Sequence, residues 1–366
     1  MLYLVNVLGS GGSERNVAAI CKHCDRDRLD PVVWTLLDGG DYEPSVREAD
    51  VPIRCLRRGR SYSPVFALSA ARQIARCDAD IIHAFNPAIA FYAALARRLC
   101  GIRIPMVYYE GNSRSLGPRW RSKVSRWTAR QFTHYMANSR ASGQFLESKI
   151  SPRSPVRIIP NGHETECWRA HGDRDEIRRK LGITPEQKLA IFVGRLVEQK
   201  RVCDLLDAVA RIFPSREALR VIVVGTGSEE VKLKEQVERI GLSEVVRFLG
   251  RRRDVPQLLM ASDLFVYPSE FDGLANVVIE AALAGLPIVA CDAPGVRDAV
   301  VHGEHALLVP PRNVERLGAA IADVLDDPKR SQQRADSALQ HAMRSYTMES
   351  MLHNLSTFYD DILAEA

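Results

Sequence analysis

Two cations that follow a β-branched run have the spacing expected of an anion-binding turn. Arg195 and Lys200 come after the run at residues 188–194 and stand five residues apart at the start of a helical pattern. A guanidinium fork together with a compact ammonium charge suits the two negative charges of a diphosphate. Two solvated surface cations are the plain alternative.

Two acids further along the chain have the second informative spacing. Asp272 and Glu280 are eight residues apart, with Gly273 and Leu274 directly after the first acid. The pattern predicts that Asp272 caps a helix whose first free N–H groups, on Gly273 and Leu274, form an anion site. Glu280 lies in an apolar stretch, where a carboxylate needs hydrogen-bond donors such as sugar hydroxyls. An exposed glutamate with a buried stem is the alternative.

A glycine-rich turn follows the first β-branched run, at residues 2–8. It contains Gly11 and Gly12, where the backbone can approach a ligand closely. The dinucleotide-binding fingerprint requires a glycine at the place that Glu14 occupies, which weakens a nicotinamide interpretation. Asp38, at the end of the second run, still allows that interpretation, so a nicotinamide-dependent oxidoreductase remains an alternative.

These turns need a scaffold, and the chain alternates short β-branched runs with helical patterns throughout. We expect six strands in each half, at residues 2–8, 32–37, 80–83, 104–109, 134–138 and 156–160, and at 188–194, 219–225, 245–249, 263–267, 286–290 and 306–309. Apolar strands that alternate with helices indicate parallel sheets covered on both faces. The predicted fold class is therefore α/β, with two doubly wound, Rossmann-like domains facing a cleft, and ligands at the carboxyl ends of the strands.

The same pattern divides the chain into parts. We expect an N-terminal acceptor-binding domain at 1–160, an inter-domain connection at 161–187 and a C-terminal nucleotide-sugar-binding domain at 188–345. The connection is polar and contains glycine and proline, which favours an irregular segment. A last helix at 346–366 has apolar residues at helical spacing, and packing back on the N-terminal domain is one option for it.

The order of the motifs resembles the retaining, nucleotide-sugar-dependent glycosyltransferases of family four, which have the GT-B fold. The resemblance rests on six segments, Gly-Gly-x-Glu-Arg at 11–15, Ile-Pro-Asn-Gly at 159–162, Gly-Arg-…-Lys at 194–200, Gly-x-Gly at 225–227, Phe-Leu-Gly at 248–250 and acid-x7-Glu at 272–280. Several of these are common individually, but their order and spacing over nearly the whole chain are specific.

The resemblance implies roles for the matching residues. Arg195 and Lys200 would hold the diphosphate, Asp272 would meet the donor sugar, and Glu280 would bind the donor ribose. The other donor-binding positions that it implies are Gly11, Gly12, Gly225, Gly227, Leu249, Gly250, Arg251, Gly273 and Leu274.

Two residues depart from the family pattern. Asp272 stands where a glutamate is usual and is one methylene shorter. Phe85 occupies the second position of a His-x-His segment, so that His83 is the remaining candidate for a catalytic histidine. His83 either takes over that role or is a strand-end histidine bonded to the backbone.

The resemblance and the cations predict a glycosyltransferase that moves a sugar from a nucleoside diphosphate sugar to a hydroxyl acceptor with retention. The expected setting is the synthesis of cell-surface polysaccharide, lipopolysaccharide or glycolipid. We expect no metal and no cofactor, because cations can meet the diphosphate charge and no Asp-x-Asp pair has a metal-ligating context. Besides the oxidoreductase, a nucleotide-sugar-binding scaffold without turnover is an alternative. The nucleotide base, the sugar and the acceptor are left open.

A basic helical segment indicates where the protein could meet a membrane. Arg119, Lys123, Arg126 and Arg130 form a cationic stripe, which suits an anionic membrane surface and a lipid-linked acceptor. The neighbouring stripe consists of Trp120, Val124 and Trp127. The alternative is that the indoles pack on the sheet and the cations face water. No apolar run reaches the ~18–20 residues of a spanning helix, and a formal net charge of +5 is too small to indicate nucleic acid. We expect a cytoplasmic protein, or one peripheral to the inner face of the cell membrane.

Overall fold

The computed structural model describes residues 1–9, 11–56, 63–111, 119–168 and 174–365, without the side chains of 119–122 and 167. The chain divides into two compact units. The N-terminal unit comprises Met1–Gly162 and Met348–Ala366, and the C-terminal unit comprises His163–Thr347. The predicted boundaries at 160 and 345 lie close to these divisions. Each unit is described by itself.

The N-terminal unit is built on a seven-stranded parallel sheet with the strand order β3-β2-β1-β4-β5-β6-β7. Its strands are β1 (Leu2–Val5), β2 (Val32–Thr35), β3 (Ile53–Cys55), β4 (Ile82–Ala84), β5 (Met106–Glu110), β6 (His134–Ala137) and β7 (Val156–Ile158). Its helices are α1 (Gly12–His23), α2 (Glu43–Glu48), α3 (Pro64–Ala75), α4 (Pro87–Cys100), α5 (Arg119–Ala129), α6 (Arg140–Lys149) and α15 (Met348–Ala364).

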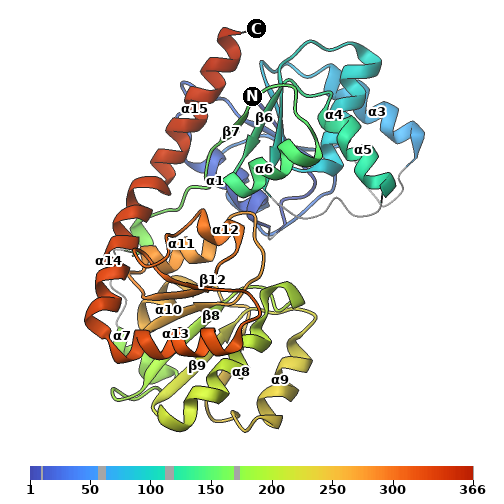
Figure 1. Ribbon diagram of the computed structural model, residues 1–366. Helices are drawn as coiled ribbons and strands as arrows, with labels where there is room; N and C mark the ends of the chain where they lie inside the picture. Colours follow the sequence, from blue (N-terminus) through green and yellow to red (C-terminus); the bar gives the residue numbers. More distant parts are fainter. Residues whose placement is uncertain (10, 57–62, 112–118, 169–173, 366) are drawn as a thin grey trace. The chain divides into compact units, whose positions relative to one another are not determined.

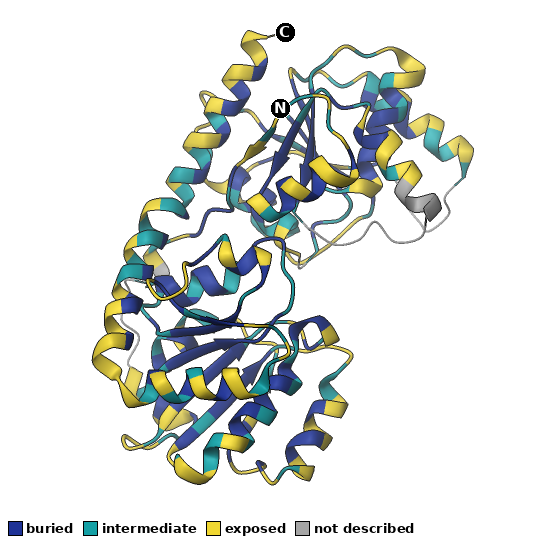
Figure 2. Cartoon of the chain, viewed as in Figure 1, coloured by how far each residue is buried: buried dark blue, intermediate teal, exposed yellow. Residues whose placement is uncertain are grey.

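Alternation along the strands gives this sheet two buried faces. On β1, Leu2 and Leu4 belong to one hydrophobic cluster, whereas Tyr3 and Val5 belong to another. Successive side chains of a strand point to opposite faces, so helices must cover both. The first cluster includes residues of α3, α4 and α6, and the second includes residues of α1 and α15. Figure 2 shows the strands of this unit as buried and the outer faces of its helices as exposed.

The C-terminal unit has a six-stranded parallel sheet with the order β10-β9-β8-β11-β12-β13. Its strands are β8 (Lys188–Val193), β9 (Leu219–Val224), β10 (Val246–Gly250), β11 (Leu264–Tyr267), β12 (Ile288–Cys291) and β13 (Leu307–Val309). Its helices are α7 (Arg174–Lys180), α8 (Val202–Ile212), α9 (Glu230–Arg239), α10 (Val255–Ala261), α11 (Asn276–Leu283), α12 (Pro294–Arg297), α13 (Val314–Asp326) and α14 (Pro328–Ser345), with 3-10 turns η1 (Glu166–Trp168), η2 (Glu198–Lys200) and η3 (Phe213–Ser215).

Both sheets have the doubly wound order, in which the strand order reverses beside the first strand of the sheet. The predicted fold class is confirmed. The expected number of strands was wrong for the first half, where β3 makes a seventh strand. β3 has only three residues and lies at the sheet edge, so its sequence carries little β-branched signal.

The segment at 161–187 was expected to be irregular, yet it contains α7. The helix is anchored by Arg178, which is buried and donates to Asp263 Oδ2 at 2.9 Å and to the carbonyl oxygen of Gln187 at 2.6 Å. Asp263 in turn accepts from the Leu189 N–H at 2.7 Å. From His163 onward, this segment therefore belongs to the body of the C-terminal unit.

The last helix, α15, packs on the N-terminal unit. Met351, Leu355 and Phe358 are buried in the same hydrophobic cluster as Tyr3. Salt bridges hold the outer side of the helix, including Arg28 to Asp360 at 2.6 Å and Arg157 to Asp361 at 2.5 Å. In Figure 1 the helix is drawn in red with the carboxyl terminus at its end. Among the described residues, no helix is both long enough and apolar enough to cross a membrane.

We predict that Gly225→Ala strongly destabilises the C-terminal unit. Gly225 has φ +131°, and a Cβ atom there would lie 1.9 Å from the Gly194 carbonyl oxygen, which is backbone and cannot swing aside. Gly241→Ala is the matched control, because its φ is +71° and nothing lies within 4 Å of the added atom. The free energy of unfolding should fall by about 1–2 kcal/mol in the control. In Gly225→Ala it should fall by more than about 3 kcal/mol.

Denaturant unfolding followed by circular dichroism measures both losses. Equal losses in the two variants would show that the turn at Gly225 can move away from Gly194.

Candidate active site

The crossover of the C-terminal sheet brings one predicted cation, Lys200, into contact with one predicted acid, Asp272. β8 pairs with both β9 and β11, so it lies where the strand order reverses. Lys200 follows β8, and Asp272 follows β11. The carboxyl ends of parallel strands at such a point form the usual ligand-binding crevice of a doubly wound sheet. The two residues meet there although they are 72 positions apart in the chain.

Lys200 and Asp272 form a largely buried ion pair. The Lys200 Nζ atom lies 2.7 Å from Asp272 Oδ1 and 2.9 Å from Asp272 Oδ2. The two side chains are only 8% and 16% exposed, so water screens the pair little. Tyr267, the last residue of β11, accepts a hydrogen bond from Lys200 and donates one to Asp272 Oδ2 at 2.8 Å. The side chains of Lys200, Asp272 and Tyr267 therefore form one hydrogen-bond network.

The loop before α11 is held by backbone contacts that fix Asp272. Gln199 accepts from the Glu270 N–H at 3.2 Å through its carbonyl oxygen, and donates from its side chain to the Phe271 carbonyl oxygen at 2.5 Å. On the other side, Gly295 lies so close that a Cβ atom there would be 2.4 Å from the Asp272 carbonyl oxygen. These contacts fix the main chain from which the Asp272 side chain extends.

The expectation that Asp272 caps a helix was wrong. α11 begins at Asn276 and its N-cap is Ala275, whose N–H bonds to the Gly295 carbonyl oxygen. Gly273 and Leu274 are buried in the loop ahead of the helix. Asp272 is drawn away from a capping geometry because Lys200 and Tyr267 bind its carboxylate.

The other predicted residues of this unit have contrasting surroundings. Arg195 is exposed just after β8. Glu280, on α11, is half-buried, and its Oε1 atom lies 3.9 Å from Nδ1 of the buried His163. The sequence analysis did not single out His163.

Three turns lie against one another at the carboxyl ends of β8, β9 and β10. The Gly225 N–H donates to the Gly250 carbonyl oxygen at 2.8 Å, and the Leu196 N–H donates to the Thr226 carbonyl oxygen at 2.9 Å. Gly227 packs on the main chain of Leu196, where a Cβ atom would come within 2.2 Å of the carbonyl oxygen. The predicted donor-binding positions of this region, including Leu249 and Arg251 at the end of β10, are therefore adjacent to the turn that carries Arg195.

In the N-terminal unit, the glycine-rich turn lies at the corresponding reversal of the strand order, beside β1 and β4. Gly11 is the N-cap of α1 and Gly12 its first residue, and both are exposed. Ser10, within the same turn, lies outside the described residues. Exposed main chain at a helix N-terminus can contact an anionic or polar ligand.

His83 lies in the core of the N-terminal unit. It is 0% exposed, stacks on Phe85 with ring centroids 4.2 Å apart, and its Nδ1 atom lies 2.7 Å from the Tyr359 hydroxyl of α15. Burial lowers the pKa of His83 to about 3, so the ring is neutral at physiological pH. These contacts favour the structural alternative, although the partner is a side chain and not the backbone as expected. A catalytic role for His83 stays a prediction.

Besides His163, the sequence analysis missed Tyr267 and Gln199. Tyr267 is the last residue of an apolar strand, directly before Pro268 and Ser269 of the acid-containing segment. The Tyr267 hydroxyl, a single polar atom at the end of an apolar strand, was the signal that could have identified this residue. Gln199 gave no signal beyond its position beside Lys200. No cluster of three histidine, cysteine or acidic side chains that could hold a metal occurs in the part of the chain that the structure describes.

Two family models match the chain, one for each half. The model described as Glycosyltransferase Family 4 matches residues 10–166, and the model described as Glycosyl transferases group 1 matches residues 173–341. The match therefore includes the glycine turn of the N-terminal unit and the whole cation and acid cluster of the C-terminal unit.

Individual relatives agree with these models. The lipopolysaccharide core biosynthesis mannosyltransferase LpsB of Rhizobium meliloti (strain 1021) is 25% identical over 278 residues, covering 74% of this chain and 76% of the relative. The D-inositol 3-phosphate glycosyltransferase of Corynebacterium glutamicum (strain R) is 30% identical over 220 residues, which cover 57% of this chain and about half, 52%, of that relative. The structure of Anabaena Alr3699/HepE in complex with UDP has a TM-score of 0.87 at 24% identity, covering 98% of this chain and 99% of that one.

The fold and the site define a two-domain sugar transferase. The chain belongs to the GT-B glycosyltransferases of family four. The predicted resemblance is confirmed in this respect, and the oxidoreductase alternative is set aside.

We predict that Lys200 and Arg195 differ sharply in their effect on stability. Lys200→Ala should lower the free energy of unfolding by about 3 kcal/mol, because it leaves the Asp272 carboxylate without its ammonium partner at a poorly hydrated site. Arg195→Ala is the matched control, and its exposed side chain should contribute less than about 0.5 kcal/mol. Thermal unfolding followed by calorimetry gives both values. Indistinguishable unfolding of the two variants would mean that the Lys200 ion pair contributes nothing to the fold.

Proposed function

We propose that the protein transfers a sugar from a nucleoside diphosphate sugar to a hydroxyl acceptor with retention, in the synthesis of cell-surface polysaccharide, lipopolysaccharide or glycolipid. The observation that carries the proposal is the contact of Lys200 with Asp272 at the carboxyl ends of β8 and β11, with Arg195 and Glu280 in the same unit. Support for a nucleotide donor comes from Anabaena Alr3699/HepE, which was solved with UDP and with UDP-glucose.

The charges of the site suit departure of a diphosphate. As the glycosidic bond stretches, negative charge grows on the leaving phosphate oxygens, and cations held in place bind the transition state more strongly than the ground state. Lys200 is already paired with Asp272, whereas Arg195 is exposed and presents its charge at the end of β8. Arg195 is therefore the cation through which the diphosphate would first be bound.

The acids and the glycine turns supply the other parts of the proposed reaction. Asp272 would bind the donor sugar, and Glu280 would bind the ribose. Carboxylates accept hydrogen bonds from the hydroxyl groups of either sugar. The turns at Gly225 and Gly250 pack closely on each other, and their main-chain groups would contact the nucleotide. The acceptor would bind the N-terminal unit, near Gly11 and Gly12.

We infer that no metal ion and no further cofactor are needed, since Arg195 and Lys200 can neutralise the diphosphate. We also infer a cytoplasmic location, with the acceptor linked to lipid at the inner face of the membrane. The name of LpsB, a lipopolysaccharide core mannosyltransferase, supports this setting.

A transfer assay tests the proposed function. UDP-, GDP- and ADP-sugars are first compared by thermal shift, where a bound donor at 100 times its Kd should add about 2.7 kcal/mol to the free energy of unfolding. The stabilising donor is then incubated with sugar and lipid-linked acceptors in excess EDTA. We expect nucleoside diphosphate release, with the donor's anomeric configuration in the product seen by NMR. Binding without any turnover would indicate a scaffold, and restoration of lost turnover by Mg²⁺ would contradict metal independence.

Arg195→Ala should lower kcat in this assay by about 10²–10³-fold at saturating donor, because one preorganised partner of the developing anion is lost. Arg195→Lys should restore only part of the rate, since an ammonium lacks the guanidinium fork. Arg211→Ala, which removes an exposed arginine of α8, is the control and should leave kcat unchanged. Near-normal kcat in Arg195→Ala would exclude the proposed diphosphate contact.

Peripheral membrane binding is supported by the outer surface of α5. Lys123 and Arg126 are exposed there, and so is Arg130 directly after the helix. Trp127, which is 36% exposed, also contacts Phe91 with ring centroids 6.0 Å apart. The indole thus packs on α4 while one part of it remains accessible. The side chain of Arg119, the fourth cation of the predicted stripe, lies outside the part of the chain that the structure describes.

We predict that changing Lys123, Arg126 and Arg130 together to Gln weakens binding to anionic vesicles about 100-fold, at roughly 1 kcal/mol per cation. The matched control changes Lys232, Lys234 and Arg239, three exposed cations of α9, to Gln and should bind as the wild type does. Co-sedimentation with phosphatidylglycerol vesicles measures both. If vesicle binding fell equally in the two triple variants, the effect would depend on the net charge of the protein alone. That outcome would contradict α5 as the membrane contact.

A further inference from the structure

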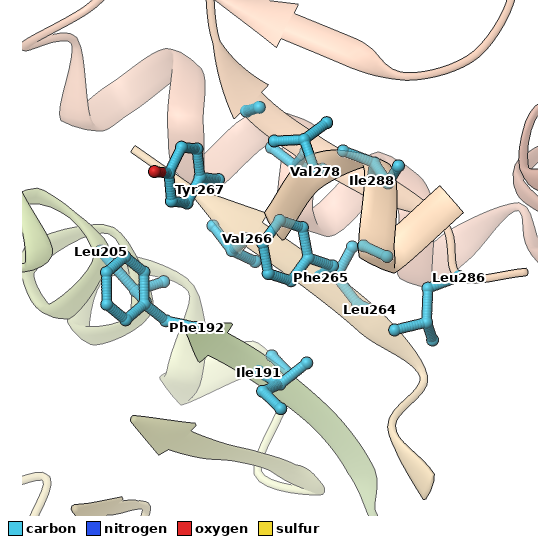
Figure 3. Packing of buried hydrophobic residues seen from close by; sticks show 14 of the residues in the cluster. Ile191, Phe192, Leu205, Leu264, Phe265, Val266, Tyr267, Val278, Leu286 and Ile288 are labelled. Carbon is cyan, nitrogen blue, oxygen red and sulfur yellow. The ribbon is translucent and has the colours of Figure 1, made fainter. Parts of the chain in front are cut away.

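Tyr267 combines an apolar core position with a polar contact in the site. Its ring stacks between Phe192, at a centroid distance of 6.0 Å, and Phe265, at 5.8 Å, with interplanar angles of 17° and 19°. Figure 3 shows the hydroxyl oxygen at the end of the ring that points away from Val278 and Ile288. Packing in this layer therefore needs an aromatic ring, which a phenylalanine would supply equally well, and the hydroxyl needs another explanation.

The hydroxyl links the two charged residues of the site. It donates to Asp272 Oδ2 at 2.8 Å and accepts from the Lys200 ammonium, which also lies 4.8 Å from the centre of the tyrosine ring. Burial, and then the negative charge of Asp272, raise the pKa of Tyr267 well above its ordinary value. The phenol therefore stays protonated at physiological pH and remains a donor to the carboxylate.

The Tyr267 hydroxyl gives the Asp272 carboxylate a contact with a rigid partner. The Asp272 carboxylate can rotate about its side-chain bonds, and the ammonium of Lys200 ends a flexible four-carbon stem. A hydroxyl carried on a ring that cannot move in a packed core fixes both at once. Tyr267 is 2% exposed, so solvent cannot take its place without disturbing the core.

We propose that Tyr267 is a positioning residue, which keeps the Asp272 carboxylate and the Lys200 ammonium in one arrangement for the donor. The inference rests on the proposed function for its catalytic consequence, but the contact itself can be tested without any donor. The hydroxyl acts through Asp272 and Lys200 and touches no reacting atom.

The first test is Tyr267→Phe, which deletes one oxygen and keeps the ring. We expect kcat to fall about 10- to 100-fold through misplacement of the charged groups, with less than a threefold change in donor KM. Tyr108→Phe is the matched control. Among the described residues, the buried Tyr108 hydroxyl has no hydrogen-bond partner, so its removal should not change kcat. An unchanged kcat in Tyr267→Phe would overturn the proposal.

A double-variant cycle separates positioning from a merely structural role. If the hydroxyl acts through the carboxylate, Tyr267→Phe should cost little once Asp272→Ala has removed the acceptor. We therefore expect the double variant to have less than a twofold lower kcat than Asp272→Ala alone. Losses that multiply in the double variant would show that Tyr267 acts independently of Asp272.

The same cycle in thermal unfolding needs no donor. Loss of a hydrogen bond to a charged group should lower Tm by about 3–10 °C in Tyr267→Phe, and by much less when Asp272 is already alanine. If the wild type transferred no sugar from any donor, the proposed function would fail while this coupling in Tm could still hold. Equal Tm losses in both backgrounds would overturn the positioning role itself.

Discussion

The pairing of β8 with β11 is the constraint on which the site depends. The strands are not consecutive in the chain, yet Ala190 lies beside Leu264 and Ile191 beside Phe265 in the parallel ladder. This register determines that the turn after β8 and the loop after β11 leave the sheet side by side. An ion pair as little hydrated as Lys200 with Asp272 is stable only when both partners are held in contact. The sheet provides that contact, and a shift of either strand would leave two charges unpaired.

Much of the fold could be predicted from the sequence, because alternating β-branched runs and helical patterns leave few arrangements of a parallel sheet. The order of the motifs likewise indicated which loops carry the chemistry. The side-chain contacts could not be predicted in the same way. The residues next to Asp272 in the sequence predict that it caps a helix. The fold shows instead that Lys200 and Tyr267 bind its carboxylate. β3 is too short to give a periodic signal.

His83 shows the same limit from another direction. Its place at the end of the strand expected at 80–83 suggested access to a ligand, because carboxyl ends of strands line the crevice of such sheets. In the structure His83 is the middle residue of β4. Whether a strand residue faces solvent depends on the helix that covers that face of the sheet. Here the covering residue, Tyr359, comes from α15 and is 276 positions away from His83 in the chain. Its hydroxyl group is hydrogen-bonded to the Nδ1 atom of the His83 ring. No local pattern could have revealed this partner.

The course of α15 also affects how the protein is made. The N-terminal unit takes part of its core, including Leu355, Phe358 and Tyr359, from the end of the chain, whereas the C-terminal unit is one continuous stretch. Domains fold as units during synthesis. The core of the C-terminal unit therefore needs residues from one continuous stretch alone, whereas the core of the N-terminal unit is complete only after α15 has been made. Until then, the part of the sheet face that α15 covers is an exposed apolar surface, to which a chaperone could bind.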